Sequence, residues 1–252
     1  MSGFRAFLRK DLREIVRTWR IWVLPGFLAF AALTGPPTAR FTKELLETLG
    51  GGGFGAMIPD PTWVDSYAQW TKNLTQLVTI ALLIALGGAV SSEKRAGTAV
   101  MVLTKPVSRA AFVASKFLST AVLLVGATLV GMVVTWGVSL IFFPDAPFGT
   151  LLAATLAWLV FALLLVAVVI AASAAVDSGA GASGIGLGFF LLLTIAGLWG
   201  PMVRWTPAGM VNGPVTVGAG IDVDLTWPLL TSVLLTGVFL VVAVRVFERR
   251  EL

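Results

Sequence analysis

The chain has 252 residues, of which 57% are hydrophobic and only 12% are charged, whereas soluble domains carry about a quarter charged residues. This balance predicts an integral membrane protein, so the net charge of +5 is interpreted from the position of each basic residue and not as a sign of nucleic-acid binding. The chain contains no histidine and no cysteine, which excludes imidazole bases, imidazole or thiolate metal ligands, and disulfides.

Residues 1–20 are predicted to form an amphipathic helix on the membrane surface. Apolar residues recur at the three-and-four spacing of one helical face, and the other faces carry basic residues that include Arg5, Arg9, Arg13 and Arg17. Such a helix lies along anionic headgroups, either as an elbow helix that also contacts a partner or as a simple anchor. A signal peptide is disfavoured because this amphipathic segment is long for the charged region of one.

Six apolar stretches predict six transmembrane helices, at residues 21–39, 74–90, 117–143, 151–176, 180–200 and 227–247. The first is expected to be interrupted by Pro25 and closed by Pro36 and Pro37, with a short amphipathic helix following at 41–49. The predicted fold class is therefore all-α integral membrane, a six-span domain over 21–247 with an N-terminal amphipathic interfacial (elbow) helix and a short tail at 248–252.

The segments that connect these spans are interpreted from their composition. Trp63, Tyr67 and Trp70 are expected to form an aromatic belt at the membrane–water interface before the second span. Residues 201–226 are rich in glycine and proline and are predicted to be an irregular loop.

Two runs of small residues are predicted to pack helices together within the chain rather than to form a dimer face. Gly184 and Gly188 make a GxxxG motif in the fifth span, and the fourth span carries a ladder of Ala167, Ala171 and Ala175.

The distribution of lysine and arginine predicts the orientation. Fourteen of the 18 basic residues fall in 1–20, in 91–116 and at Arg245, Arg249 and Arg250, which all lie on one side if the chain has six spans. We therefore expect a multi-pass protein of the cell membrane with both termini in the cytoplasm.

Several chemistries are disfavoured by what the spans lack. No acidic or basic residue lies near the middle of any predicted span, which argues against a proton- or ion-coupled transporter. Residues 181–184 spell GASG, the nucleophile motif of six-span rhomboid proteases, but a nucleophilic Ser183 needs a base and the chain has no histidine. No zinc motif or nucleotide-binding loop is present, so an energy source has to lie in another chain.

The cytoplasmic segment 91–116 is the most informative part of the sequence. Residues 98–104 are expected to form about two helical turns, which Pro106 ends, and Ser108 is placed to cap a helix that leads into the third span. The result is a short helix between two membrane helices, suited to docking in a groove of a soluble partner through its apolar residues.

The residues of this segment resemble the signature of ABC type-2 transporter permeases. The matching features are Glu93, Gly97 and Thr98, the apolar turn over 100–103, the Lys-Pro-Val-Ser-Arg run over 105–109, and Lys116. The resemblance implies the membrane-spanning permease subunit of an ATP-driven exporter, with no catalytic residue, cofactor or metal in this chain. It implies two partners, a cytoplasmic ABC ATPase that binds ATP and Mg, and a second permease copy in a homodimer.

The residues expected to couple the chain to the ATPase are Glu93, Lys94, Arg95, Gly97, Thr98, Val100, Leu103, Lys105, Pro106 and Arg109. Three alternatives stay open: a non-transporting anchor or assembly subunit that recruits an ATPase, an intramembrane hydrolase centred on Ser183, and a basic segment that contacts only anionic lipid. The apolar spans suit a hydrophobic or amphipathic cargo.

Overall fold

The computed structural model of the chain describes residues 20–50, 59–89, 91 and 109–249. This described part is helical and contains no strand. Its elements are α2 (Arg20–Gly50), α3 (Trp63–Asn73), the π-helix η2 (Leu74–Val78), α4 (Thr79–Leu86), α7 (Arg109–Phe142), α8 (Phe148–Ala175), α9 (Gly179–Ala196), α10 (Gly200–Trp205), α11 (Gly209–Gly218) and α12 (Thr226–Arg249).

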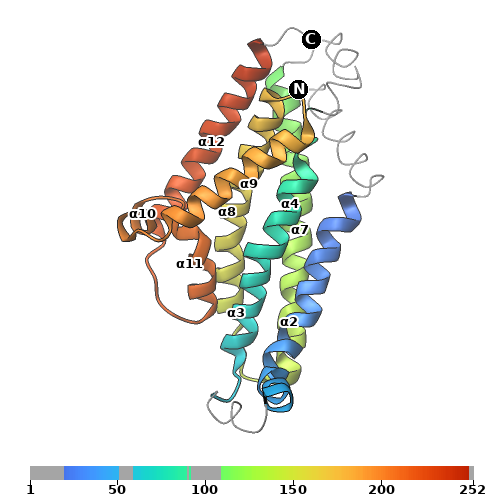
Figure 1. Cartoon of the computed structure of the whole chain (residues 1–252), viewed down its shortest axis with the longest axis vertical. Helices are drawn as coiled ribbons and strands as arrows, with labels where there is room; N and C mark the ends of the chain where they lie inside the picture. The colour runs from blue at the N-terminus through green and yellow to red at the C-terminus, as the bar shows by residue number, and fades with distance from the viewer. Residues whose placement is uncertain (1–19, 51–58, 90, 92–108, 250–252) are drawn as a thin grey trace.

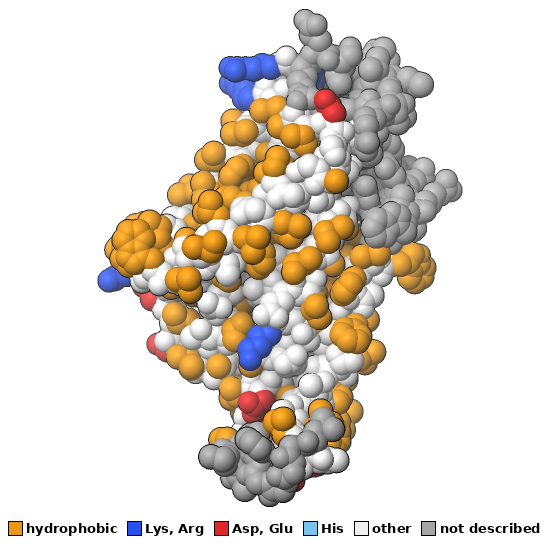
Figure 2. Space-filling model, viewed as in Figure 1, with side chains coloured by type: hydrophobic (Ala, Val, Ile, Leu, Met, Phe, Trp, Pro, Cys, Tyr) orange, Lys and Arg blue, Asp and Glu red, His pale blue; other side chains and the backbone are white. Residues whose placement is uncertain are grey.

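The long helices form a bundle around α8 (Figure 1). Helix α8 packs against α12, α11, α9, α7 and α4, and 78% of its most apolar stretch is buried, compared with 11% for α12. Trp158 and Phe161 of α8 are completely buried in the core. Hydrophobic side chains are spread over the whole length of the described face shown in Figure 2, as expected where lipid replaces water as the solvent.

Four of the described helices, α7, α8, α9 and α12, are long and apolar enough to cross a membrane, as judged by length and composition. They overlap the predicted spans at 117–143, 151–176, 180–200 and 227–247, although α7 begins earlier, at Arg109. The all-helical membrane fold is thus confirmed. The predicted first and second spans correspond to α2 and to the unbroken helical run α3–η2–α4.

Helix α2 departs from the prediction. It continues through Pro36 and Pro37 to Gly50, so the separate helix expected at 41–49 is the end of α2 itself. Figure 1 shows the last turns, at the bottom of the view, turned away from the axis of the rest. A helix can continue through a proline bend when neighbouring helices support it on both sides of the bend. Helix α2 has such support, because it packs along α7 and α3.

The expected aromatic belt is also wrong for two of its three members. Tyr67 and Trp70 lie in α3 with 0% of each side chain exposed, whereas Trp63 is half-buried. The indole Nε1 of Trp70 donates a hydrogen bond to Thr155 Oγ1 at 3.1 Å, and the Tyr67 hydroxyl donates to the carbonyl of Pro147 at 3.1 Å. These partners satisfy the polar atoms, so the rings can be buried and need not lie at the interface.

Residues 201–226 are not an irregular loop throughout, because they contain most of α10 and all of α11. Pro201 stands in the first turn of α10, where its missing N–H costs nothing. Pro214 lies inside α11, which packs against α8 and α3. The predicted surface helix at 1–20, apart from its last residue, the helix at 98–104 and the cap at Ser108 lie outside the described residues.

Candidate functional site at the ends of α4 and α7

One end of the bundle brings together the last turn of α4, the first turn of α7, and the ends of α8, α9 and α12 (Figure 1, top). The predicted coupling segment joins α4 to α7, so both of its flanks lie at this end. Of the residues predicted to contact an ATPase, only Arg109 is described, together with Lys116 of the same motif. The other nine, Glu93, Lys94, Arg95, Gly97, Thr98, Val100, Leu103, Lys105 and Pro106, lie outside the described residues, so their role stays a prediction.

The α4 flank is fixed to α8 by a buried serine bridge. The Ser173 hydroxyl donates to the Gly87 carbonyl at 2.9 Å and accepts from the Ser91 backbone N–H at 3.0 Å. Both serines are completely buried. An unsatisfied polar group in an apolar interior is costly, so the bridge favours this position of residue 91 over any that breaks it.

The same turn of α4 lies against α9 at very short range. A Cβ atom added to Gly87 would overlap the Ser183 hydroxyl oxygen and the Gly179 carbonyl oxygen. A Cβ on Gly179 would lie 3.2 Å from the Cα of Gly88. Glycines on both helices therefore permit the backbones to approach, as small residues do in membrane interfaces.

Ser183, considered as a nucleophile from its motif, is part of this contact. Its hydroxyl donates to the carbonyl of Leu83 at 3.0 Å, and the residue is buried. A hydroxyl that donates to a backbone carbonyl links α9 to α4, and the chain supplies no histidine to activate it. This geometry favours a packing role for Ser183.

The α7 flank is fixed to α12. Arg109 Nη1 donates to the carbonyls of Phe247 and Glu248 at 2.8 and 2.7 Å. The last carbonyls of a helix lack intrahelical partners, and a cation is favourable at that end of the helix dipole. Nearby, the rings of Phe112 and Phe247 stack with centroids 5.2 Å apart and an interplanar angle of 10°.

Lys116 is also buried at this end, with 8% of its surface exposed. Its ammonium lies 5.8 Å from the centroid of the Phe112 ring, within the range of a cation–π interaction. The arrangement as a whole holds both flanks of the predicted coupling segment against three other helices, so a displacement of the segment would be passed to α8, α9 and α12.

Sequence reasoning missed the residues that make these links, namely Gly87, Ser91, Ser173 and Phe247. The Gly87–Gly88 pair at the end of an apolar run was the one local signal. The described residues contain no group of three or more side chains able to hold a metal ion.

The two predicted small-residue runs have different outcomes. Ala167 and Ala171 are buried in α8, which confirms their packing within the chain, and Ala175 is half-buried. Gly184 and Gly188 are exposed, and an added Cβ on either would meet nothing within 4 Å, so the GxxxG motif does not pack inside the chain. Gly186 packs instead, since a Cβ there would lie 2.5 Å from Val169 Cγ2.

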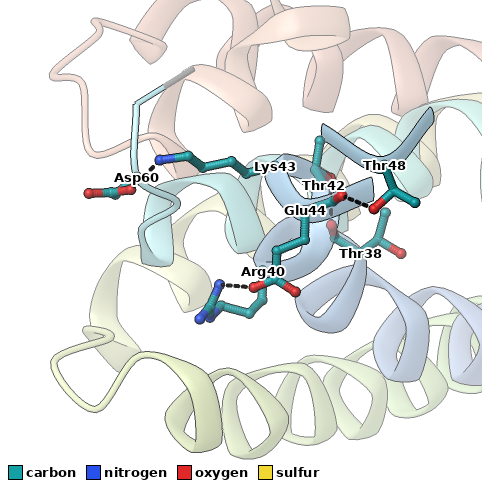
Figure 3. A network of polar contacts seen from close by, with 7 residues as sticks. All are labelled: Thr38, Arg40, Thr42, Lys43, Glu44, Thr48 and Asp60. Atoms are coloured by element: carbon teal, nitrogen blue, oxygen red, sulfur yellow. Dashed lines mark hydrogen bonds and ion pairs between the residues drawn. The ribbon is translucent and has the colours of Figure 1, made fainter. Parts of the chain in front are cut away.

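The opposite end of the bundle carries a polar network between the end of α2 and the segment before α3 (Figure 3). Lys43 Nζ and Asp60 Oδ1 form an ion pair at 2.7 Å, and Arg40 pairs with Glu44 at 3.3 Å along α2. The hydrogen bond from Lys43 holds the pKa of Asp60 below its ordinary value, and the same bond raises the pKa of Lys43. A hollow of about 240 Å³ lies beside this pair.

Comparison with known proteins agrees with a membrane location. The chain is 22% identical over 263 residues to the uncharacterized transmembrane protein YxlG of Bacillus subtilis (strain 168), covering 100% of this chain and 99% of that protein. With the four apolar helices, this similarity identifies a transmembrane protein. The model of the family described as protein of unknown function, DUF2705, matches residues 57–252. The chain therefore belongs to the DUF2705 family.

Proposed function

We propose that the chain is the permease subunit of an ATP-driven exporter and that it receives force through segment 91–116. The observation that carries this proposal is the fixation of both flanks of that segment, by Ser91 beyond the end of α4 and by Arg109 on α7. A segment that only interacted with lipid would need no such attachment. A segment that transmits motion needs such an attachment, because an unattached segment would move without displacing the helices.

The proposal includes six spans, with α2 and the run α3–η2–α4 crossing the membrane in addition to the four apolar helices. Among the described basic residues, Arg20 begins α2, Arg109 and Lys116 lie near the start of α7, and Arg245 and Arg249 lie near the end of α12. The other four are Arg40 and Lys43 in the second half of α2, Lys72 in the last turn of α3, and Arg204 in α10. This asymmetry supports cytoplasmic termini at the end where segment 91–116 is attached.

In the proposed mechanism, ATP and Mg are bound by a separate cytoplasmic ABC ATPase, and this chain has no catalytic residue or cofactor of its own. Two copies of the chain form the transport path. ATP binding closes the ATPase, the docked segments follow, and the path opens outward. Nucleotide drives this change only by the difference in its affinity for the two conformations, and a shift from 1:99 to 99:1 requires about 5.5 kcal/mol.

Site-directed crosslinking tests the docking. Because the chain has no cysteine, single cysteines are introduced without altering native thiols, as Val100→Cys and Leu103→Cys within the segment. The matched control is Arg249→Cys, at the exposed end of α12 and outside the segment. We expect the two segment positions to crosslink to an ABC ATPase identified by mass spectrometry, and the control to crosslink much less. Equal crosslinking at all three positions, or none to an ATPase, would contradict the proposal.

Charge reversal completes the test. Lys94→Glu with Arg95→Glu is expected to abolish ATPase copurification, whereas Arg249→Glu at the exposed end of α12 is expected to leave it unchanged. Arg109 is unsuitable for this purpose because its reversal would also break the contact with α12. Nucleotide-dependent cargo movement in proteoliposomes then separates a permease from an anchor subunit, since both would bind the ATPase.

A further inference from the structure

A hollow of about 580 Å³ lies between the end of α9, the short helices α10 and α11, and the segment that leads into α12. This volume is in the range of small-molecule sites. Four of its lining positions are glycines, at residues 197, 200, 209 and 213, so the wall carries few side chains there. At Gly209 the glycine is required, because a Cβ would overlap the Val203 carbonyl oxygen and lie 2.9 Å from Pro228.

The wall of the hollow combines an apolar part with two opposite charges. Leu198, Val203 and Leu225 contribute apolar surface, while Arg204 and Asp224 contribute a cation and an anion. Within the described part of the chain the guanidinium of Arg204 makes no hydrogen bond or ion pair, and its carbon lies 5.2 Å from the centroid of the Trp205 ring. Its donors are therefore available to a ligand.

The carboxyl of Asp224 has a hydrogen-bond partner within the chain. Its Oδ1 accepts a hydrogen bond from the Thr226 backbone N–H at 2.9 Å, at the start of α12. Hydrogen bonds from Thr226, and the positive charge of Arg204, hold the pKa of this carboxyl below its ordinary value. A negative and a positive charge are thus both present in one hollow without forming a direct ion pair.

The surroundings of the hollow have the composition of a membrane–water interface. Trp199, Trp205 and Trp227 are all exposed, and the last two rings lie 5.1 Å apart. Exposed indoles gather at the level of lipid headgroups. In Figure 2, basic and acidic side chains lie beside hydrophobic ones at the left edge of the molecule, where Figure 1 places α10.

We propose that this hollow binds the headgroup of a zwitterionic phospholipid that carries a primary ammonium. Arg204 pairs with the phosphate, Asp224 pairs with the ammonium, and the acyl chains leave over the apolar wall beside Leu198. A purely anionic headgroup would leave Asp224 facing a like charge, and a purely cationic ligand would face Arg204. The inference goes beyond the proposed function and holds whether or not the chain couples to an ATPase.

Native mass spectrometry of the detergent-purified chain with added lipid tests the inference. The probes are a phosphatidylethanolamine, a phosphatidylglycerol with the same acyl chains, and water-soluble glycerophosphoethanolamine. The variants are Arg204→Gln and Asp224→Asn, of which the second retains an oxygen acceptor for the Thr226 N–H. The matched control is Arg40→Gln, which removes another arginine that lies outside this hollow.

We expect phosphatidylethanolamine to bind more tightly than phosphatidylglycerol and Arg204→Gln to weaken its binding about tenfold, as for loss of a charge-assisted hydrogen bond. Asp224→Asn should remove the preference between the two lipids, and Arg40→Gln should bind as the unmodified chain does. The proposed site would be overturned if Arg204→Gln bound phosphatidylethanolamine as tightly as the unmodified chain does, or if Arg40→Gln lost as much binding as Arg204→Gln. Equal binding of both lipids by the unmodified chain would overturn the zwitterionic ligand. Displacement of bound phosphatidylethanolamine by an equal concentration of glycerophosphoethanolamine would show that the acyl chains add nothing to binding, and would overturn the proposal that the ligand is a lipid.

Discussion

Replacement of Gly87 by alanine tests the close approach of α4 and α9 that fixes one flank of segment 91–116. The added Cβ would overlap two atoms of α9, the Ser183 hydroxyl oxygen and the Gly179 carbonyl oxygen. The serine side chain can rotate away, but the carbonyl belongs to the backbone. Helix α4 therefore has to move from α9, and the Ser173 bridge to the Gly87 carbonyl moves with it.

The size of the effect follows from three contributions. Overpacking of a well-packed interior costs about 1–3 kcal/mol, and a backbone clash belongs at the upper end of that range. Loss of the Ser183 hydrogen bond adds about 0.6 kcal/mol, the mean for such bonds in membrane proteins. Gly87 follows the end of α4 with helical φ and ψ, so the smaller conformational entropy of alanine in the unfolded chain offsets up to about 1 kcal/mol. The net destabilisation of Gly87→Ala is therefore about 2–3 kcal/mol.

Equilibrium unfolding in mixed detergent, followed by tryptophan fluorescence, measures this free energy. The matched control is Gly137→Ala on α7, where an added Cβ meets nothing within 4 Å. The control should be stabilised by about 0.5–1 kcal/mol, so the two variants should differ by about 3 kcal/mol. A difference below about 1 kcal/mol would refute the described contact.

A second substitution locates the clash. Ser183→Ala in the Gly87→Ala background removes the contact with the hydroxyl oxygen, but the Gly179 carbonyl remains. We expect the double variant to recover less than half of the lost stability. Full recovery would show that the serine, and not the backbone of α9, limits the approach.

Three further predictions concern single side chains. Ser183→Ala alone should reduce stability by about 0.6 kcal/mol and leave any measured activity unchanged, whereas a hydrolase centred on this serine would lose its activity. Arg109→Gln should accelerate amide hydrogen exchange in the last turn of α12 by roughly tenfold. Arg109→Lys should restore only part of the protection, because the lysine ammonium stands one bond nearer the backbone than Nη1, which reaches both carbonyls. Lys43→Gln should raise the pKa of Asp60 towards its ordinary value, as measured by an NMR titration. Because the pKa of Asp60 is lowered in the folded chain, the ion pair contributes to stability above the ordinary aspartate range. That contribution is lost as pH falls through the lowered pKa.

The long apolar helices could be predicted from the sequence because the thickness of the membrane fixes their length. The predicted spans at 151–176 and 227–247 differ from α8 and α12 by at most three residues at either end. The continuation of α2 past Pro36 and Pro37 could not be predicted, because local rules for proline omit the support that α7 and α3 provide.

The burial of Tyr67 and Trp70 could not be predicted from the sequence either. The rings of Tyr67 and Trp70 suit an interface or a core, and the choice depends on whether partners exist for their polar atoms. Those partners, Pro147 and Thr155, lie 80 and 85 residues further along the chain. No local pattern reports contacts at that separation.

At the candidate site too, local sequence patterns indicated the segment of interest but not its contacts. Segment 91–116 was singled out by a resemblance that stays a prediction, and the contacts that hold its flanks join residues far apart, such as Ser91 with Ser173 and Arg109 with Phe247. The GxxxG motif at Gly184 and Gly188 illustrates the reverse error. A small-residue spacing shows that one helix face permits close approach, and it does not show which neighbour, if any, occupies that face.

The basic end of the bundle and the hollow beside α10 are linked by the same helices. Helix α12 is tied to α7 at the basic end by Arg109, and near its other end it borders the hollow that contains Arg204 and Asp224. Helix α9 is likewise fixed to α4 by Ser183 and ends at the hollow with Leu198. If the proposed motor displaces segment 91–116, α9 and α12 are both displaced, and a difference between their displacements changes the width of the hollow beside them. A lipid bound there would then have different affinities in the two conformations, which is the condition for it to alter the conformational equilibrium.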